Sequence, residues 1–159
     1  MTITVRPAAP GDVALILDMV RALAVYEREP DAVRATEQSL GETLFGADPR
    51  VFVHIAERDG QPLGIALWFL TYSTWTGRPS LYLEDLFVAD EARGTGTGRA
   101  LLTALAREAK RLGCARMDWA VLDWNSKAMD FYAHIGAARQ TGWQPWRIEG
   151  EALDRLAEG

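Results

Sequence analysis

The sequence is short of the residues that build disulfides and metal clusters. Among its 159 residues there is one cysteine, Cys114, and there are two histidines, His54 and His134, all far apart in the chain. A single cysteine cannot form an internal disulfide, and isolated histidines favour neither a metal site nor a catalytic triad. We therefore expect Cys114 to be a buried packing residue, and we expect no metal.

Long apolar runs and blocks of basic residues are also missing. The longest apolar stretch, residues 64–70, is far shorter than the roughly 18 residues that a membrane span needs. The first residues lack the basic end and apolar core of a signal peptide, so the cytoplasm is the expected location. The net charge is -5 without clustered lysines or arginines, which argues against a nucleic-acid partner because phosphates demand such clusters.

What remains is typical of an ordinary globular domain. Hydrophobic residues make up 48% of the chain and charged residues 25%, without repeats or linker-like tracts, so we expect one domain over 1–159. Asp59-Gly60 predicts a hairpin turn. Apolar periodicity predicts helices over 13–24, 36–45, 101–112, 126–135 and 151–157, and strands over 3–6, 51–57, 63–72, 81–88, 115–121, 137–141 and 143–149. This order, βααβββαβαββ, predicts a mixed α/β sheet.

A glycine-rich segment, residues 93–98, joins a predicted strand to a predicted helix. The N–H groups of a first helical turn have no partner within the helix, and the helix dipole adds positive charge, so such a loop suits a phosphate. Arg93 and Arg99 could add charge. The Gly-x-Gly-x-Gly spacing differs from both the nucleotide P-loop and the dinucleotide fingerprint. A connecting loop without a ligand is the alternative.

The loop and its neighbours resemble the GNAT superfamily of N-acetyltransferases. Arg93-Gly-Thr-Gly96-Thr-Gly98 is similar to the superfamily's Arg/Gln-x-x-Gly-x-Gly/Ala signature, which cradles the pyrophosphate of acetyl-CoA. Leu81-Tyr-Leu-Glu-Asp-Leu-Phe-Val88 and Asp123-Trp-Asn-Ser-Lys-Ala-Met-Asp-Phe-Tyr132 narrow the resemblance to the spermidine/spermine (diamine) and thialysine acetyltransferases. The resemblance covers nearly the whole chain. It implies the GNAT fold with a mostly antiparallel central sheet and flanking helices, acetyl-CoA as co-substrate, and a homodimer.

The resemblance also implies which residues bind the two substrates. The backbone of Leu86, Phe87 and Val88 would hold the pantetheine arm like an added strand. The rest of acetyl-CoA would contact Arg93, Gly94, Thr95, Gly96, Thr97, Gly98 and Arg99, and on its other side Asn125, Ser126, Lys127 and Ala128. The amine site would be lined by Tyr26, Glu27, Glu84, Asp118, Trp119 and Ala120, to which we add Asp85 and Trp75 as candidates.

Two residues are candidates for proton transfer. An ammonium has no lone pair, so the amine must lose a proton before it attacks the thioester, and Glu84 is the candidate base. An acidic pair, Glu84-Asp85, in an apolar strand is costly to bury unless it has a partner. The alternative is that either acid simply pairs with an arginine or caps a loop. By the resemblance, Tyr132 would protonate the leaving thiolate, whereas the residues alone favour a core aromatic at this position. No covalent intermediate is needed.

The sequence departs from the polyamine enzymes in two places. Ser73-Thr74 and Gln140-Thr141 stand where those enzymes carry acidic residues. Fewer carboxylates weaken the case for a long polycation and leave acetyl transfer itself unaffected. The predicted function is acetylation of a primary amine on a small molecule, such as a diamine, polyamine, thialysine or an amino-acid-like amine. A protein N-terminal or lysine acetyltransferase and a non-catalytic acyl-CoA-binding domain are the alternatives.

Overall fold

The computed structural model describes residues 2–159, which form two compact units that meet between Ala120 and Val121. In the described residues, the first unit holds a five-stranded sheet in the order β1-β2-β3-β4-β5. Its elements are β1 (Thr4–Pro7), η1 (Pro10–Asp12), α1 (Val13–Tyr26), α2 (Glu37–Phe45), β2 (Val51–Arg58), β3 (Gln61–Ser73), β4 (Arg78–Val88), η2 (Asp90–Ala92), α3 (Thr97–Arg111) and β5 (Met117–Trp119). The first four strands are antiparallel and β5 runs parallel to β4, which confirms the predicted mixed α/β class.

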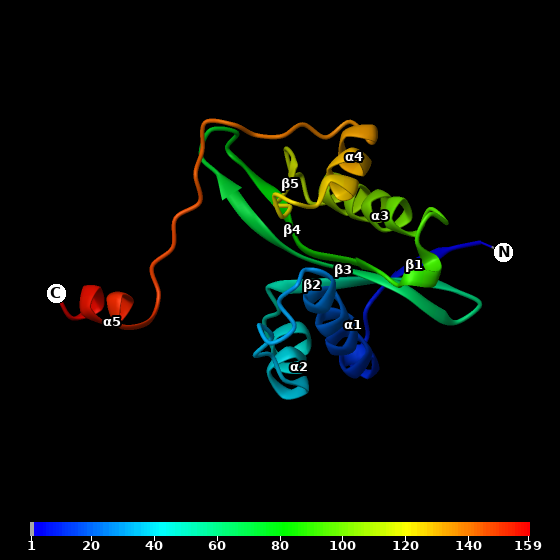
Figure 1. Cartoon of the computed structure of the whole chain (residues 1–159), viewed down its shortest axis with the longest axis horizontal. Coiled ribbons are helices and arrows are strands. Elements are labelled where there is room, and N and C mark those ends of the chain that lie inside the picture. Colours follow the sequence, from blue (N-terminus) through cyan, green and yellow to red (C-terminus); the bar gives the residue numbers. More distant parts are fainter. Residues whose placement is uncertain (1) are drawn as a thin grey trace. The chain divides into compact units, whose positions relative to one another are not determined.

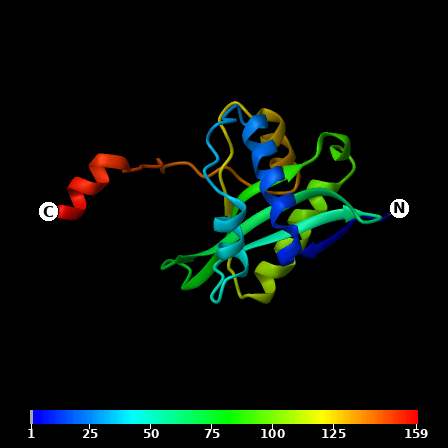
Figure 2. The same ribbon diagram turned by 90° about the horizontal axis from the view of Figure 1, so that it is seen from below.

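Helices cover both faces of this sheet. Helices α1 and α2 lie on one face and α3 on the other (Figure 1, Figure 2). The core under α1 and α2 is continuous and includes Ile16, Leu17, Leu40, Ile55, Ile65 and Phe87. Helix α3 buries Leu101, Leu105 and Ala109 at helical spacing. No helix within residues 2–159 is long and apolar enough to cross a membrane.

Capping and turn residues fix the ends of several elements. The Thr36 hydroxyl accepts the N–H of Ser39, and the Ser39 hydroxyl accepts the N–H of Thr36, which together form a capping box at the start of α2. Asp59 and Gly60 turn the β2–β3 hairpin with positive φ angles of 52° and 77°. The hairpin predicted at these two residues is confirmed.

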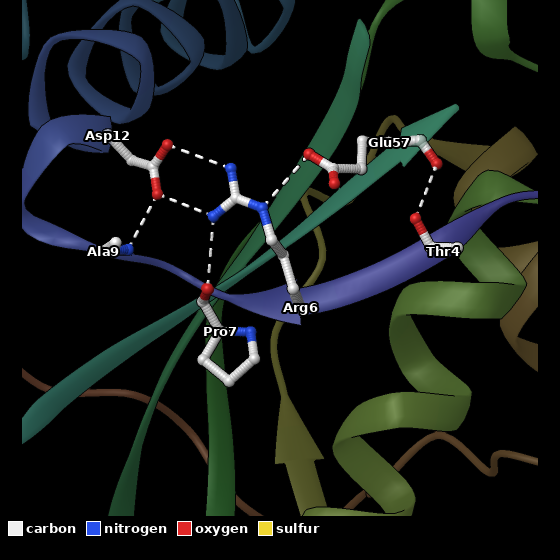
Figure 3. Close-up of polar contacts among 6 residues, drawn as sticks. All are labelled: Thr4, Arg6, Pro7, Ala9, Asp12 and Glu57. Carbon is white, nitrogen blue, oxygen red and sulfur yellow. Dashed lines mark hydrogen bonds and ion pairs between the residues drawn. The ribbon is translucent and has the colours of Figure 1, made fainter. Parts of the chain in front are cut away.

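Arg6 ties β1 to β2 and to the start of α1 (Figure 3). Its two terminal nitrogens donate to the Asp12 carboxylate at 2.8 and 3.1 Å, and its Nε donates to Glu57 at 3.1 Å. Asp12 also accepts the backbone N–H of Ala9 at 2.7 Å. The Arg6 guanidinium is the main reason why the pKa of Asp12 lies below its ordinary value. One side chain therefore joins β1 to the start of α1, six residues away, and to β2, which is distant in sequence.

Strand β4 carries a bulge at Glu84. Leu67 of β3 lies opposite Asp85, whereas the next residue, Trp68, lies opposite Leu83, so Glu84 has no partner of its own in β3. A bulge of this kind bends a strand and reverses the alternation of its side chains. Consequently Asp85 follows the bulge on the same strand segment as the core residue Phe87.

Strand β5 accompanies β4 only as far as this bulge. Leu81, Tyr82 and Leu83 lie opposite Met117, Asp118 and Trp119, where the pairing ends. Residues 84–88 of β4 continue beside β3, and in the described part of the first unit no strand pairs with their other edge. This segment therefore presents an open strand edge.

The second unit contains α4 (Ser126–His134) and α5 (Gly150–Glu158). Here the structure differs from the predicted order, because residues 137–149, all of them described, form neither of the two strands expected there. A strand is stable only beside a hydrogen-bonding neighbour. Residues 138–149 are exposed, and no strand of the described second unit offers such a neighbour.

Gly64 allows β3 to lie close against the end of β4. A Cβ added at Gly64 would lie 2.4 Å from the carbonyl oxygen of Phe87 and 3.2 Å from the Cα of Val88. Both contacts are with backbone, which cannot move aside as a flexible side chain can. A larger residue at this position must therefore displace the open-edged segment of β4.

We expect Gly64→Ala to lower the free energy of unfolding by about 1–3 kcal/mol, because β4 must shift. Gly41→Ala is the matched control. Its Cβ would lie 3.8 Å from Val13 Cγ2, an ordinary contact, and alanine favours a helix over glycine by up to about 1 kcal/mol. Urea denaturation measures both variants against the native chain. A Gly64→Ala chain as stable as the native one would contradict the close approach.

Candidate active site

The glycine-rich loop has the geometry of an anion-binding helix start. Gly94 and Gly96 have φ angles of 76° and 90°, in the left-handed region that glycine adopts without strain. Gly96 is the N-cap of α3, and no side chain caps this helix. The N–H groups of Gly96, Thr97, Gly98 and Arg99 therefore have no acceptor within the helix, and the helix dipole adds positive charge beside them.

Two threonine side chains form hydrogen bonds within this loop and hold its conformation. Thr97 is 1% exposed, and its hydroxyl lies 2.9 Å from that of Thr95. The Thr95 hydroxyl donates to the carbonyl oxygen of Ala92 at 2.6 Å. Both side chains are thus occupied with the loop itself, and its backbone N–H groups are its remaining anion-binding groups.

Arg93, which we expected to add charge at the pyrophosphate, is engaged by three neighbours. Its Nε donates to the carbonyl oxygen of Val88 at 3.2 Å, and one terminal nitrogen lies 2.9 Å from Asp90 Oδ1. Its guanidinium carbon lies 4.5 Å from the centre of the Tyr26 ring. Arg99, by contrast, is exposed on the first turn of α3.

Three carboxylates gather where the end of α1 meets the bulge of β4. Glu27 caps the C-terminus of α1, Glu84 is the bulge residue and Asp85 follows it. Burial, and then the charges of Glu84 and Glu27, raise the pKa of Asp85 to about 6. Burial and the charge of Glu84 also raise the pKa of Glu27. These carboxylates are therefore close enough to repel one another.

No cation offsets the repulsion that Glu27 and Asp85 experience in this acidic cluster of Glu27, Glu84 and Asp85. The charge of Glu84 raises the pKa of both carboxyl groups, and no cation lowers the pKa of either one. For Asp85, the alternative of simple pairing with an arginine is thus not what the structure has. An acidic cluster that is partly buried and lacks a cation attracts a cationic ligand.

Strand β5 places two more expected residues beside the cluster. Asp118 and Trp119 lie opposite Tyr82 and Leu83, directly before the bulge. Asp118 accepts from Arg116 at 2.9 Å. Burial, followed by the charges of Glu84 and Asp118, raises the pKa of Tyr82. Ala120 ends the first unit and is exposed.

Trp75 lies away from the cluster. It occupies the turn between β3 and β4 and is 84% exposed. Strand β4 begins at Arg78, and at about 3.3 Å per residue its run to Glu84 spans about 20 Å. The geometry of the first unit therefore does not bring Trp75 to the acidic residues, and its role stays a prediction.

The remaining expected residues belong to the second unit. Asn125 is the N-cap of α4, and its side chain accepts the N–H of Ala128 at 3.2 Å. The Tyr132 ring contacts that of Phe131, with centroids 5.5 Å apart. The expected roles of Asn125, Ser126, Lys127 and Ala128 in binding the donor, and of Tyr132 as an acid, stay predictions that the first unit does not test.

Other polar features lie elsewhere. A hollow of about 160 Å³ near β2 is lined by His54, Trp68 and Glu108 among apolar residues, and Trp68 Nε1 donates to His54 Nδ1 at 3.0 Å. Its lining includes none of the acidic cluster. Cys114 is a buried free thiol, as predicted. Within the described chain, no group of three or more His, Cys, Asp or Glu side chains has an arrangement that could hold a metal ion.

Sequence reasoning found the acidic residues and missed the bulge that arranges them. The one signal was the adjacent Glu84-Asp85 pair within an otherwise apolar strand. It also missed the link from Arg93 to Val88 and Tyr26, because that link joins residues from three separate elements.

The chain is similar to known acetyltransferases in sequence and in fold. Residues 16–137 match the acetyltransferase (GNAT) family. A thialysine N-epsilon-acetyltransferase of Sus scrofa is 41% identical over 98% of both chains, and an L-ornithine N5-acetyltransferase of Arabidopsis thaliana is 29% identical over 96% of this chain and 86% of that protein. An integron cassette protein from the mobile metagenome of V. cholerae has a TM-score of 0.81 at 29% identity, over 100% of this chain and 99% of that one.

The chain belongs to the GNAT family of acetyltransferases. Members of this family take the acetyl group from acetyl-CoA and pass it to an amine. The family, the fold class and the enzyme class expected from the sequence are therefore confirmed.

The raised pKa of Asp85 has a measurable consequence for stability. Because this pKa lies above the ordinary value of 3.8, the folded chain holds the proton more tightly than the unfolded one, and stability falls as the pH rises from about 4 to about 6. We expect Asp85→Asn to raise the free energy of unfolding by up to about 3 kcal/mol at pH 7 and to leave it unchanged at pH 4.

The control for this measurement is Asp31→Asn, which removes an exposed carboxylate from a loop. Its effect is expected to be small and equal at both pH values. Urea titrations at pH 4 and pH 7 decide the matter. An Asp85→Asn chain that is less stable than the native chain at pH 7 would show that the charged form of Asp85 is favoured by its surroundings.

Proposed function

We propose that this chain transfers an acetyl group from acetyl-CoA to a primary amine of a small molecule, by direct attack of the amine in a ternary complex. The observation that carries the proposal is the acidic cluster of Glu27, Glu84 and Asp85, whose repulsion at Glu27 and Asp85 no cation offsets and which adjoins the open edge of β4. A negatively charged cluster beside a strand edge suits an ammonium ion and an amide-containing cofactor at once.

The donor side rests on two backbone features. The edge at Leu86, Phe87 and Val88 has no neighbouring strand in the described part of the first unit, where only its Val88 carbonyl is engaged, by Arg93. Its other outward N–H and C=O groups can bind the amides of a pantetheine arm as an added strand. The start of α3 offers N–H groups and dipole charge to a pyrophosphate. The two features are joined by the few residues of η2, so that one extended ligand can span them.

Glu84 is proposed as the base. As the extra residue of the bulge it is exposed and outside the ladder with β3, and bulges commonly redirect a side chain at an active site. An ammonium ion with a pKa near ~10.4 must lose a proton at neutral pH, and a carboxylate in direct or one-water reach accepts it. The role of Tyr132 as the acid that protonates the thiolate is proposed on the family resemblance alone.

The acceptor is proposed to be an amino-acid-like amine. The two relatives described above are named for thialysine and ornithine, both of which are amino acids with a primary amine at the end of the side chain. The acidic cluster suits that terminal ammonium. Ser73-Thr74 and Gln140-Thr141 offer no further carboxylates for the more distant charges of a polyamine.

The test is release of the CoA thiol from acetyl-CoA with thialysine, ornithine, lysine, putrescine and spermidine. We expect turnover with the amino acids, and we expect Glu84→Gln and Tyr132→Phe each to lower kcat by about 10²–10⁴. Glu37→Gln, which neutralises an exposed acid on α2, is the control and should match the native rate. Peptides with a free N-terminus or a lysine side chain complete the panel. Turnover only with these peptides, or no turnover despite acetyl-CoA binding, would contradict the proposal.

We also propose that the chain pairs with a second copy through its C-terminal segment. Trp146 is 91% exposed, and on α5 Leu153 and Leu156, one turn apart, are both exposed. Apolar side chains so exposed on a short helix usually mark an interface. The family resemblance names a second copy as the occupant, and a symmetric partner could also give residues 143–149 a neighbouring strand.

Sedimentation equilibrium tests this pairing. We expect a native mass twice the 17.6 kDa of one chain, and a single-chain mass for Trp146→Glu or Leu156→Glu at micromolar concentration. Gln144→Glu adds the same charge to the same segment at a polar position and should stay paired. A native chain that sediments at 17.6 kDa at tens of micromolar would contradict the pairing.

A further inference from the structure

We infer that Arg93 is a positioning residue: it fixes the end of α1, and with it the amine site, against the donor-binding end of β4, and it is not a phosphate ligand. This inference rests on the proposed function, and it concerns a residue whose place in the glycine-rich motif suggests the opposite role.

The contacts of Arg93 differ in strength. Its ion pair with Asp90 lies at the surface, where the Asp90 side chain is 84% exposed, and such pairs hold little. The hydrogen bond from Nε to Val88 is partly buried, and the guanidinium lies over the Tyr26 ring. The hydrogen bond holds the guanidinium at its edge and the Tyr26 ring holds it at its face, so that the two contacts together fix the orientation of this planar cation. Val88 and Tyr26 are therefore the partners that define its position.

A guanidinium held in this way is not available to a pyrophosphate. To reach an anion over the glycines, Arg93 would have to give up both the Val88 carbonyl and the Tyr26 ring. The loop does not require its charge, because the backbone of Gly96, Thr97 and Gly98 and the dipole of α3 already attract an anion. Arg99, exposed on the first turn of that helix, is better placed to add charge.

Tyr26, the partner of Arg93 in the cation–π contact, lies beside a turn with an uncommon backbone conformation. Tyr26 is the last residue of α1, Glu27 caps the helix, and Arg28 has a φ of 65°, which a residue other than glycine adopts only when its surroundings hold it. The ring of Tyr26 is where Arg93 holds this turn. Fixing the position of Tyr26 also fixes the next residue, Glu27, which belongs to the acidic cluster.

Arg93 contributes to the acidic cluster by holding Glu27 in place, and its positive charge does not stabilise the carboxylate. Were its charge felt at Glu27, it would lower the pKa of that carboxyl, yet burial and Glu84 raise this pKa without opposition from Arg93. Arg93 therefore leaves the acidic cluster free to hold a substrate cation. It sets the spacing between that cluster and Val88, the last residue of the strand edge proposed for pantetheine.

The test compares Arg93→Gln with Arg99→Gln, two variants that remove one positive charge from the same loop. Calorimetry gives the Kd of acetyl-CoA, and the Kd of thialysine with CoA bound, neither of which needs turnover. For Arg93→Gln we expect the thialysine Kd to rise about tenfold and the acetyl-CoA Kd to change less than threefold. For Arg99→Gln we expect the reverse pattern, with acetyl-CoA binding also less dependent on salt.

A double-mutant cycle then isolates the contact with Tyr26. If Arg93 acts through that ring, Arg93→Lys weakens thialysine binding in the native chain but has little further effect in a Tyr26→Leu chain. Additive effects in the cycle would overturn the inference. So would an Arg93→Gln chain that loses acetyl-CoA affinity tenfold and keeps thialysine affinity, which would make Arg93 a phosphate ligand.

The same data separate this inference from the proposed function. A chain that binds thialysine as expected but releases no CoA thiol would refute the proposed acetylation while leaving the role of Arg93 supported. A native chain that binds no thialysine would overturn both, because there would be no amine site for Arg93 to position. Thermal melting of each variant identifies any loss of affinity that comes from unfolding.

Discussion

One extra residue in β4 determines the arrangement of the candidate site. Because Glu84 has no partner in β3, the strand bends there, and β5, paired up to Leu83, does not follow. Two consequences come from this single irregularity. The backbone of residues 84–88 is left with an open edge, and a carboxylate is placed at the point where that edge begins. A regular β4 would have neither.

The electrostatics of the site work against the stability of the fold. Raising the pKa of Asp85 from 3.8 to about 6 corresponds to about 3 kcal/mol of unfavourable interaction for its charged form, more than a typical surface ion pair returns. Elsewhere the fold does pair its charges, as Arg6 does with Asp12 and Glu57. The repulsion among the carboxylates of the acidic cluster is not relieved within the fold, and a site for a cationic substrate requires such unbalanced negative charge.

The local features of this fold could be predicted from the sequence. Apolar residues at helical spacing gave α1 and α3, Thr36 marked the start of α2, and the glycines of the loop marked the start of α3, because each of these signals depends on neighbours within a few residues. Glu84 and Asp85 were candidates from the sequence alone, since charge in an apolar strand is conspicuous, whereas Glu27 became a candidate only through the family resemblance.

Features that depend on distant partners could not be predicted. A period of two cannot show which residue of a strand is extra, so the bulge at Glu84 was invisible in the sequence. The contact of Arg93 with Tyr26 joins residues 67 positions apart, so the motif suggested a phosphate ligand where the structure has a link to α1. Residues 143–149 have the alternation of a strand, and in the described second unit they have no strand beside them.

The central claim is that the open edge of β4 and the start of α3 together hold the acetyl donor. Amide hydrogen exchange of the native chain, with and without saturating acetyl-CoA, tests it most directly. We expect saturating acetyl-CoA to slow amide hydrogen exchange by about tenfold or more at residues 86–88 and 96–99, and to leave exchange in β2 unchanged. Saturating acetyl-CoA that leaves both segments unprotected, or protects only segments outside them, would contradict it.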